Sequence, residues 1–132
     1  MKDRNISVLK HMLKYCKQAE ETLDKYKNNK NEFLNNHDFK DSISMKVFQI
    51  GELANHLTEE YREKTIKEIN WYEIIGMRNH FAHGYGDMDI GVIFDTAIQD
   101  IPVLKEFCIK EIDRLDPPED KPEKKEESEE DS

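Results

Sequence analysis

The residues with the clearest chemical potential lie between Arg78 and Tyr85, in the sequence RNHFAHGY. Arg78, Asn79, His80 and His83 bring a permanent positive charge, an amide and two imidazoles into one short segment. A guanidinium binds phosphate through a planar fork of N–H donors, and histidine exchanges protons near neutral pH. Together these groups are suited to binding a phosphodiester and moving protons around it.

Such groups can cleave RNA without a metal ion. A base removes the proton of the 2′-hydroxyl, the oxygen attacks the adjacent phosphorus, and an acid protonates the leaving 5′-oxygen. We assign His83 to general acid or base catalysis, Arg78 to stabilising charge in the phosphorane-like transition state, and Asn79 to orienting the imidazole or the phosphate. The alternative is structural: Arg78 pairs with an acidic residue, and His83 caps the C-terminus of a helix.

The two proposed catalytic residues do not share a face of a regular helix. At about 100° per residue, positions 78 and 83 lie about 140° apart. Both can therefore contact one ligand only near a frayed helix end or across a symmetric interface. A dimer cleft is the simpler arrangement, because a second copy then brings its own Arg78 and His83 to the same phosphate. We therefore expect a homodimer.

A metal-dependent hydrolase is a weaker alternative. His80 and His83 could place two imidazoles toward one ion, and Asp87 and Asp89 are near in sequence. No third ligand lies at a suitable local spacing, however. We therefore expect a site without a metal ion or another cofactor.

Composition predicts a single helix-rich domain. Charged residues make up 37% of the 132 residues, hydrophobic residues 36%, and there are only five glycines and four prolines. The apolar runs are too short to cross a bilayer, and the N-terminal sequence MKDRNISVLK lacks the apolar stretch of a secretory signal. We therefore expect a soluble cytoplasmic protein, with Cys16 and Cys108 packed as small hydrophobic residues.

Apolar residues recur at helical spacing along most of the chain. The expected helices cover about Asp3 to Lys27, Asp38 to about Leu57, Thr58 to Glu63, Asn70 to Gly84, and Asp89 to about Leu115. Residues 27–36 are interpreted as a loop around one helical turn, and Trp71 as a packing anchor. The fold class is therefore all-α, an antiparallel bundle of four to five helices over residues 1–115.

Two of these helices have well-defined apolar stripes. The stripe of the second long helix suits the core or contact with a second copy, and consists of Phe39, Ile43, Val47, Ile50, Ala54 and Leu57. The stripe of the last helix should be buried, and consists of Val92, Ile93, Ala97, Ile101, Leu104, Cys108 and Ile112.

Residues 116–132 are predicted to form a disordered acidic tail. The sequence DPPEDKPEKKEESEEDS contains no large apolar residue. Residues 113–132 hold ten acidic and four basic residues, so they supply most of the net charge of −9. The chain thus lacks the broad positive surface of a general nucleic-acid binder, and RNA contacts should be local and involve few phosphates.

The pattern Arg78-x4-His83-x-Tyr85, with Asn79 directly after the arginine, resembles a known family. It is similar to the HEPN superfamily and, within it, to the HepT toxins of the MNT/HepT toxin–antitoxin systems. Further similarity lies in Ile50-Gly51-Glu52, in Asn70-Trp71, and in the order of helices across about residues 4–112.

The resemblance implies an α-helical homodimer in which the Arg78 and His83 pairs converge in a cleft and act as a metal-independent endoribonuclease. It also implies a partner, an MNT-type nucleotidyltransferase antitoxin that uses ATP and magnesium to attach AMP to Tyr85. Gly84 and Gly86 fit that role, because they would leave the phenol on a pliable segment. Attached AMP would lie two residues from His83 and compete with substrate phosphate for Arg78.

Two questions stay open at this point. Glu52 either reaches the cleft and holds Arg78 by a charged hydrogen bond, or is simply solvated. The alternative function is a non-catalytic helical interaction module, which binds the nucleotidyltransferase or a nucleotide through the same cleft without cutting RNA.

Overall fold

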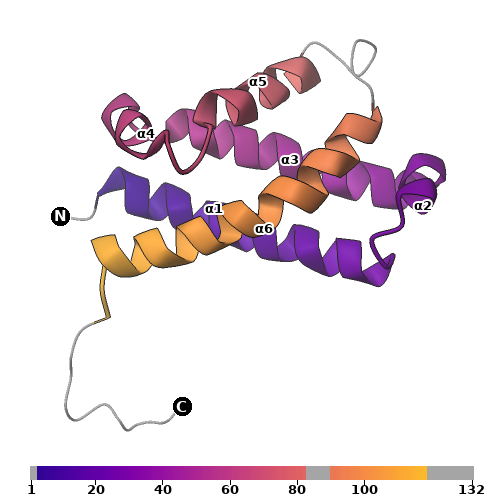
Figure 1. The fold of residues 1–132 in the computed structure, drawn as a ribbon, viewed down its shortest axis with the longest axis horizontal. Helices are drawn as coiled ribbons and strands as arrows, with labels where there is room; N and C mark the ends of the chain where they lie inside the picture. The colour runs from indigo at the N-terminus through magenta and orange to yellow at the C-terminus, as the bar shows by residue number, and fades with distance from the viewer. Residues whose placement is uncertain (1–2, 83–89, 119–132) are drawn as a thin grey trace, which may run out of the picture.

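Six α-helices make up the part of the chain that the computed structural model describes, which is residues 3–82 and 90–118, without the side chains of 80–82. They are α1 (Arg4–Lys25), α2 (Lys30–Asn35), α3 (His37–His56), α4 (Glu59–Thr65), α5 (Trp71–Ala82) and α6 (Ile90–Leu115). No strand occurs within these ranges, and α1, α3, α5 and α6 alternate in direction (Figure 1). The predicted all-α antiparallel bundle is confirmed, while most of the predicted tail, residues 119–132, lies outside the described part.

Side-chain caps explain where several helices begin. The Thr58 hydroxyl accepts a hydrogen bond from the backbone N–H of Tyr61 at 3.2 Å, so the predicted cap of α4 is confirmed. The side-chain Oδ1 of Asn29 accepts a hydrogen bond from the backbone N–H of Glu32 at 2.9 Å, and α2 begins at this cap. The prediction of one helical turn in this region was too short, because the cap and the fully buried Phe33 stabilise a six-residue helix. Over residues 3–82 and 90–118 the bundle therefore has six helices, where four to five were expected.

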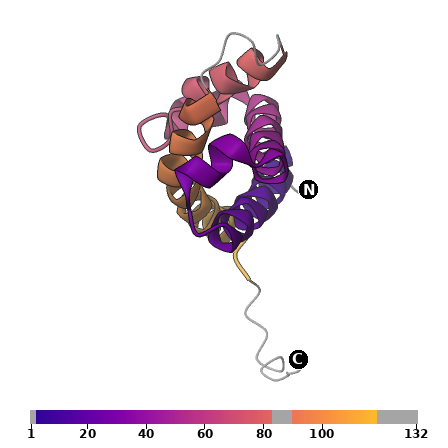
Figure 2. The same ribbon diagram turned by 90° about the vertical axis from the view of Figure 1, so that its right-hand side faces the viewer.

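The core lies between the three long helices. Helix α1 packs against both α3 and α6, α5 packs against α3, and α2 lies across one end of the bundle (Figure 2). All six residues of the predicted α3 stripe are buried, so this stripe is core. The predicted α6 stripe is correct except at its ends: Ile112 is only partly buried, and Val92 is 45% exposed while Phe94 is buried near it.

Both cysteines are free and buried in this core, as predicted. Burial raises the pKa of the Cys16 thiol and raises that of Cys108 to about 12. Both side chains therefore stay protonated near neutral pH and pack as small hydrophobic groups. None of the helices in residues 3–82 and 90–118 combines the length and apolar character needed to cross a membrane.

A hydrogen-bond network ties α4 to the last turns of α6. The Tyr61 hydroxyl donates to Glu111 Oε1 at 2.6 Å, and Arg114 donates to both carboxylate oxygens of Glu111 at 2.8 and 2.9 Å. The hydrogen bonds from Arg114 lower the pKa of Glu111, helped by Tyr61 and opposed by burial. The network therefore favours the ionised form of Glu111 in the folded protein.

This network predicts acid-sensitive stability. Because the pKa of Glu111 is lower in the folded than in the unfolded chain, its stabilising contribution is present above the unfolded pKa and is lost as the pH falls through the folded pKa. We expect Glu111→Gln to be less stable than wild type near neutral pH, with a difference that narrows below about pH 4. Urea unfolding of both proteins from neutral pH to below about pH 4 measures the difference in the free energy of unfolding. Glu106→Gln, at an exposed position of the same helix, is the control, and a difference for Glu111→Gln that is constant with pH would contradict the assignment.

Candidate active site

Helix α5 carries Arg78, and its first residue fixes its position. Trp71 is fully buried, and its indole Nε1 donates to Thr65 Oγ1 at 2.8 Å. The indole also packs edge-on against Phe107, with ring centroids 5.6 Å apart. A buried aromatic ring with a satisfied N–H is a strong anchor, so Trp71 acts as the predicted packing residue. The start of α5 is thereby held against α4 and α6.

Gly51 allows α5 to lie close to α3 at Arg78. A Cβ atom at position 51 would be 2.5 Å from Arg78 Cβ and 3.0 Å from the backbone oxygen of Ile74. Nonbonded carbon atoms do not approach that closely, so any residue larger than glycine would push the two helices apart. The glycine of the Ile50-Gly51-Glu52 sequence therefore allows the aliphatic part of the Arg78 side chain to pack directly on α3.

The guanidinium of Arg78 is held by two neighbours. Its Nε lies 3.0 Å from Glu52 Oε2, and its Nη1 donates to Asn79 Oδ1 at 2.8 Å. Nε is buried, and its N–H is not aligned for a hydrogen bond, so the contact with Glu52 is an ion pair without a hydrogen bond. Within the described residues, no group pairs with Nη2.

Glu52 therefore lies against Arg78 as an ion pair, without the charged hydrogen bond of the first alternative. This contact also satisfies the structural alternative, in which Arg78 pairs with an acidic residue. The ion pair with Glu52 involves only the Nε atom of Arg78. The side chains of Arg78 and Glu52 are 28% and 34% exposed. Arg78 is therefore oriented by α3 and still presents N–H donors that can bind an anion such as a phosphate oxygen.

The remaining predicted site residues lie at or beyond the end of α5. That helix is described as far as Ala82, the residue before His83, and the described structure of His80 is limited to its backbone. The residues outside the described part include His83, Gly84, Tyr85, Gly86, Asp87 and Asp89. Within residues 3–79 and 90–118, no three His, Cys, Asp or Glu side chains form a group that could hold a metal ion. The assignments to His83, Tyr85 and His80 stay predictions.

Some positioning residues were not predicted from sequence. The contact between Asn79 and Arg78 differs from the expected role of Asn79 toward an imidazole or phosphate, although the two roles are compatible. Thr65, which binds the indole of Trp71, gave no sequence signal because it is a small polar residue near the end of a short helix. The contact of Gly51 with Arg78 depends on how α3 and α5 cross, which spacing along one helix does not reveal.

The close approach at Gly51 gives a paired prediction. We expect Gly51→Ala to destabilise the fold by about 1–3 kcal/mol and to displace Arg78, because the added methyl overlaps Arg78 Cβ. Gly76→Ala is the control: nothing lies within 4 Å of the added methyl, so it should stabilise α5 by about 0.5–1 kcal/mol. Chemical denaturation of both variants measures the effects. A Gly51→Ala protein as stable as Gly76→Ala would contradict the proposed crossing of the helices.

Comparison with known proteins gives one family match and several relatives. The family described as "Ribonuclease HepT-like" matches residues 12–111, which include α3, α5 and most of α6. A protein of Methanocaldococcus jannaschii, named as a gamma-glutamylcyclotransferase and candidate RNase, is 30% identical over 110 residues, covering 82% of this chain and 49% of that protein.

Two shorter matches extend this finding. A candidate RNase of Caldanaerobacter subterraneus subsp. tengcongensis is 41% identical over 63 residues, covering 48% of this chain and 54% of that protein. "Probable ribonuclease HepT" of Thermococcus cleftensis is 34% identical over 56 residues, covering 42% and 50%. In each case the match spans about half of the relative's length. No solved structure matches the chain.

Proposed function

The chain belongs to the HepT-like ribonuclease family, and on that premise we propose that it is a metal-independent endoribonuclease whose site is completed by a second copy. The observation that carries the proposal is the state of Arg78, held by Glu52 and Asn79 with Nη2 unpaired among the described residues. A guanidinium restrained in this way is preorganised to bind a phosphodiester oxygen, since little rearrangement is needed when charge develops there.

The proposed reaction is an internal transfer at phosphorus. His83 removes the proton of a 2′-hydroxyl, the oxygen attacks the adjacent phosphorus, and the 5′-oxygen leaves with a proton from an imidazolium. A second His83 from the partner copy allows one imidazole to act as base and the other as acid. Arg78 stabilises the additional negative charge on the phosphoryl oxygens, and Asn79 keeps the guanidinium in place.

RNA cleavage with and without chelator tests this function. We expect the purified chain to cut RNA in excess EDTA. Activity that disappears with EDTA and returns with zinc or manganese would instead favour the metal-dependent alternative at His80, His83, Asp87 and Asp89. Absence of cleavage at every magnesium and EDTA level, together with stable binding to a nucleotidyltransferase, would favour the non-catalytic interaction module.

The proposal also includes regulation as the toxin of a toxin–antitoxin pair. Tyr85 is the acceptor of AMP from a nucleotidyltransferase partner, and it stands between Gly84 and Gly86 in the sequence. Glycine on both sides permits backbone conformations in which a second enzyme can reach the phenol. The phosphate of attached AMP would carry negative charge two residues from His83 and would compete with RNA for Arg78.

Modification at Tyr85 gives a direct prediction. On coexpression with the nucleotidyltransferase, we expect wild type to gain the mass of one or more AMP units and to lose RNA cleavage, while Tyr85→Phe gains no mass and stays active. Intact-protein mass spectrometry and cleavage assays of the same samples measure both effects. Tyr72→Phe is the control, because Tyr72 is a 50% exposed tyrosine of α5, the helix that precedes Tyr85 in the sequence. AMP on Tyr85→Phe would contradict the assignment.

A further inference from the structure

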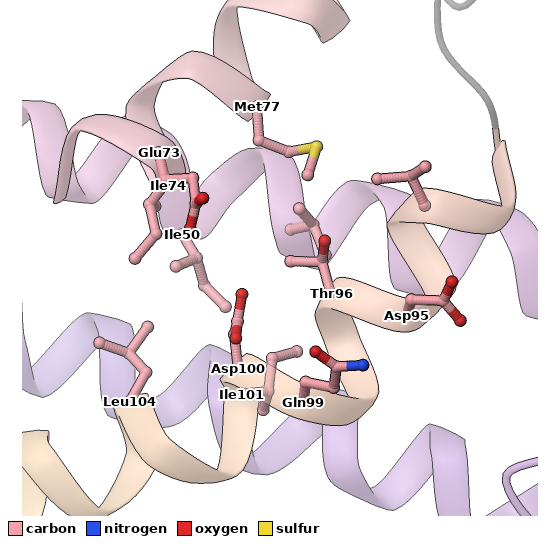
Figure 3. Close-up of a pocket in the computed structure, with 12 residues that line it drawn as sticks. Ile50, Glu73, Ile74, Met77, Asp95, Thr96, Gln99, Asp100, Ile101 and Leu104 are labelled. Atoms are coloured by element: carbon pink, nitrogen blue, oxygen red, sulfur yellow. The ribbon is translucent and has the colours of Figure 1, made fainter. Parts of the chain in front are cut away.

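A groove lies between α3, α5 and α6 and is lined by residues of all three helices. We refer to it as the α3/α5/α6 groove. Its volume is about 380 Å³, and its apolar lining includes Val47 of α3. Figure 3 shows five further apolar residues of the lining: Ile50, Ile74, Met77, Ile101 and Leu104. A volume of this size is typical of a site that binds a ligand. Because α5 packs mainly on α3, the groove separates α5 from α6.

The walls of this groove expose apolar side chains that the described chain does not cover. Ile74 and Met77 of α5 are only partly buried, although α5 begins with the fully buried Trp71. Val92 lines the groove from α6 and is 45% exposed, which is why it departs from the predicted stripe. A contiguous apolar surface at a concave site is typical of a binding surface for another protein.

The rim of the groove is negatively charged. Glu73 of α5 and Asp100 of α6 both extend into the space between these helices (Figure 3). Partial burial and the nearby Glu73 carboxylate raise the pKa of Asp100. Asp95 is paired with Lys30, whose Nζ lies 3.1 Å from its Oδ1, but no described residue supplies a cation to Glu73 or Asp100. The groove therefore offers an apolar floor with two carboxylates to which no described residue supplies a counter-ion.

Two of the helices that line the groove flank the proposed modification site in the sequence. Helices α5 and α6 form two of its walls, and residues 83–89, which contain Tyr85, connect these two helices. A protein bound in the groove would contact both helices from which this connection starts. Binding there would hold a second enzyme on the two helices between which Tyr85 lies in the sequence.

We propose that the α3/α5/α6 groove is the docking surface for a segment of the partner protein that presents apolar side chains together with lysine or arginine. The apolar side chains fill the floor, and the cation lies between Glu73 and Asp100. This inference rests on the proposed function, under which the nucleotidyltransferase supplies the segment. A second copy of this chain fits less well, since a twofold contact centred on the groove would bring like charges together.

Three variants test the docking surface, with the nucleotidyltransferase of the Tyr85 experiment as the probe. Val92→Lys places a cation and added length at the groove, and the double variant Glu73→Gln with Asp100→Asn removes the rim charge with little change in shape. Val103→Lys is the matched control, because Val103 is a 56% exposed valine of the same helix that does not line the groove. Calorimetry or surface plasmon resonance gives the dissociation constants.

We expect Val92→Lys and the double variant to weaken binding about tenfold or more, and Val103→Lys to bind like wild type. Wild-type binding should weaken with added salt, and the double variant should lose most of that dependence. RNA cleavage by each variant alone should equal that of wild type. Unchanged binding of Val92→Lys would overturn the proposal, as would loss of self-association in place of loss of partner binding.

The two proposals fail in distinguishable ways. If wild type cuts RNA and accepts AMP while the groove variants bind normally, only the docking surface is wrong. If wild type neither cuts RNA nor accepts AMP, the proposed function itself is wrong. Thermal unfolding of each variant ensures that reduced binding does not reflect an unfolded chain.

Discussion

His83→Ala is expected to lower kcat for RNA cleavage by about 10²- to 10⁴-fold, the usual contribution of one positioned acid or base. The loss should be in kcat more than in KM, because the imidazole moves protons in the transition state and contributes little to binding of the ground state. The pH–rate profile of wild type should show the ionisations of histidine, and the variant should lose them. Steady-state cleavage of a defined RNA in EDTA measures both properties.

Two other histidines separate catalysis from general effects of substitution. His56 is exposed at the end of α3, so His56→Ala should cut RNA like wild type. His80→Ala tests the additional histidine of the motif, for which we expect a smaller loss than for His83→Ala. If His83→Ala retains wild-type kcat while remaining folded and dimeric, the catalytic assignment is wrong.

Arg78→Lys is expected to lower kcat/KM by about 10²- to 10³-fold although it keeps the positive charge. Lysine carries its three N–H donors on one nitrogen atom, so it cannot reproduce the planar fork that contacts Glu52 and Asn79 and presents a separate nitrogen to phosphate. Arg78→Ala should lose at least as much activity. Single-turnover cleavage with saturating RNA separates the loss in chemistry from the loss in binding.

Glu52→Gln provides the comparison for this prediction. It keeps the size of the side chain and removes the charge that pairs with Arg78. Because the guanidinium remains, the loss of activity should be smaller than in Arg78→Lys. Arg78→Lys with wild-type kcat/KM would show that a point charge is sufficient and would contradict the role given to the fork.

Much of the fold follows from patterns within single segments. The α3 stripe is buried as predicted because apolar spacing over five turns of one helix determines which face packs inward. Thr58 was correctly identified as a cap because the interaction involves residues only three apart. The short α2 was underestimated because its stability comes from Phe33, which packs against Phe39 and Phe94 in other helices.

The candidate site was predictable in its residue types but not in its contacts. The nearness of Arg78 and Asn79 follows from sequence, whereas the ion pair between Arg78 and Glu52 joins residues 26 positions apart through the crossing of α3 and α5. That crossing depends on Gly51, whose steric role appears only when the opposing helix is in place. The α3/α5/α6 groove likewise arises from three separate helices, and the sequence pattern wrongly placed one of its lining residues, Val92, in the buried stripe of α6.

The chemical nature of the cleaved RNA ends tests the central claim most directly. Attack by a 2′-hydroxyl, with proton transfer by His83 and charge stabilisation by Arg78, leaves a 2′,3′-cyclic phosphate on one fragment and a 5′-hydroxyl on the other. We predict these ends, formed in excess EDTA by wild type and not by His83→Ala, when the fragments are analysed by mass spectrometry. Fragments with 3′-hydroxyl and 5′-phosphate ends, formed only with a metal ion, would contradict the account.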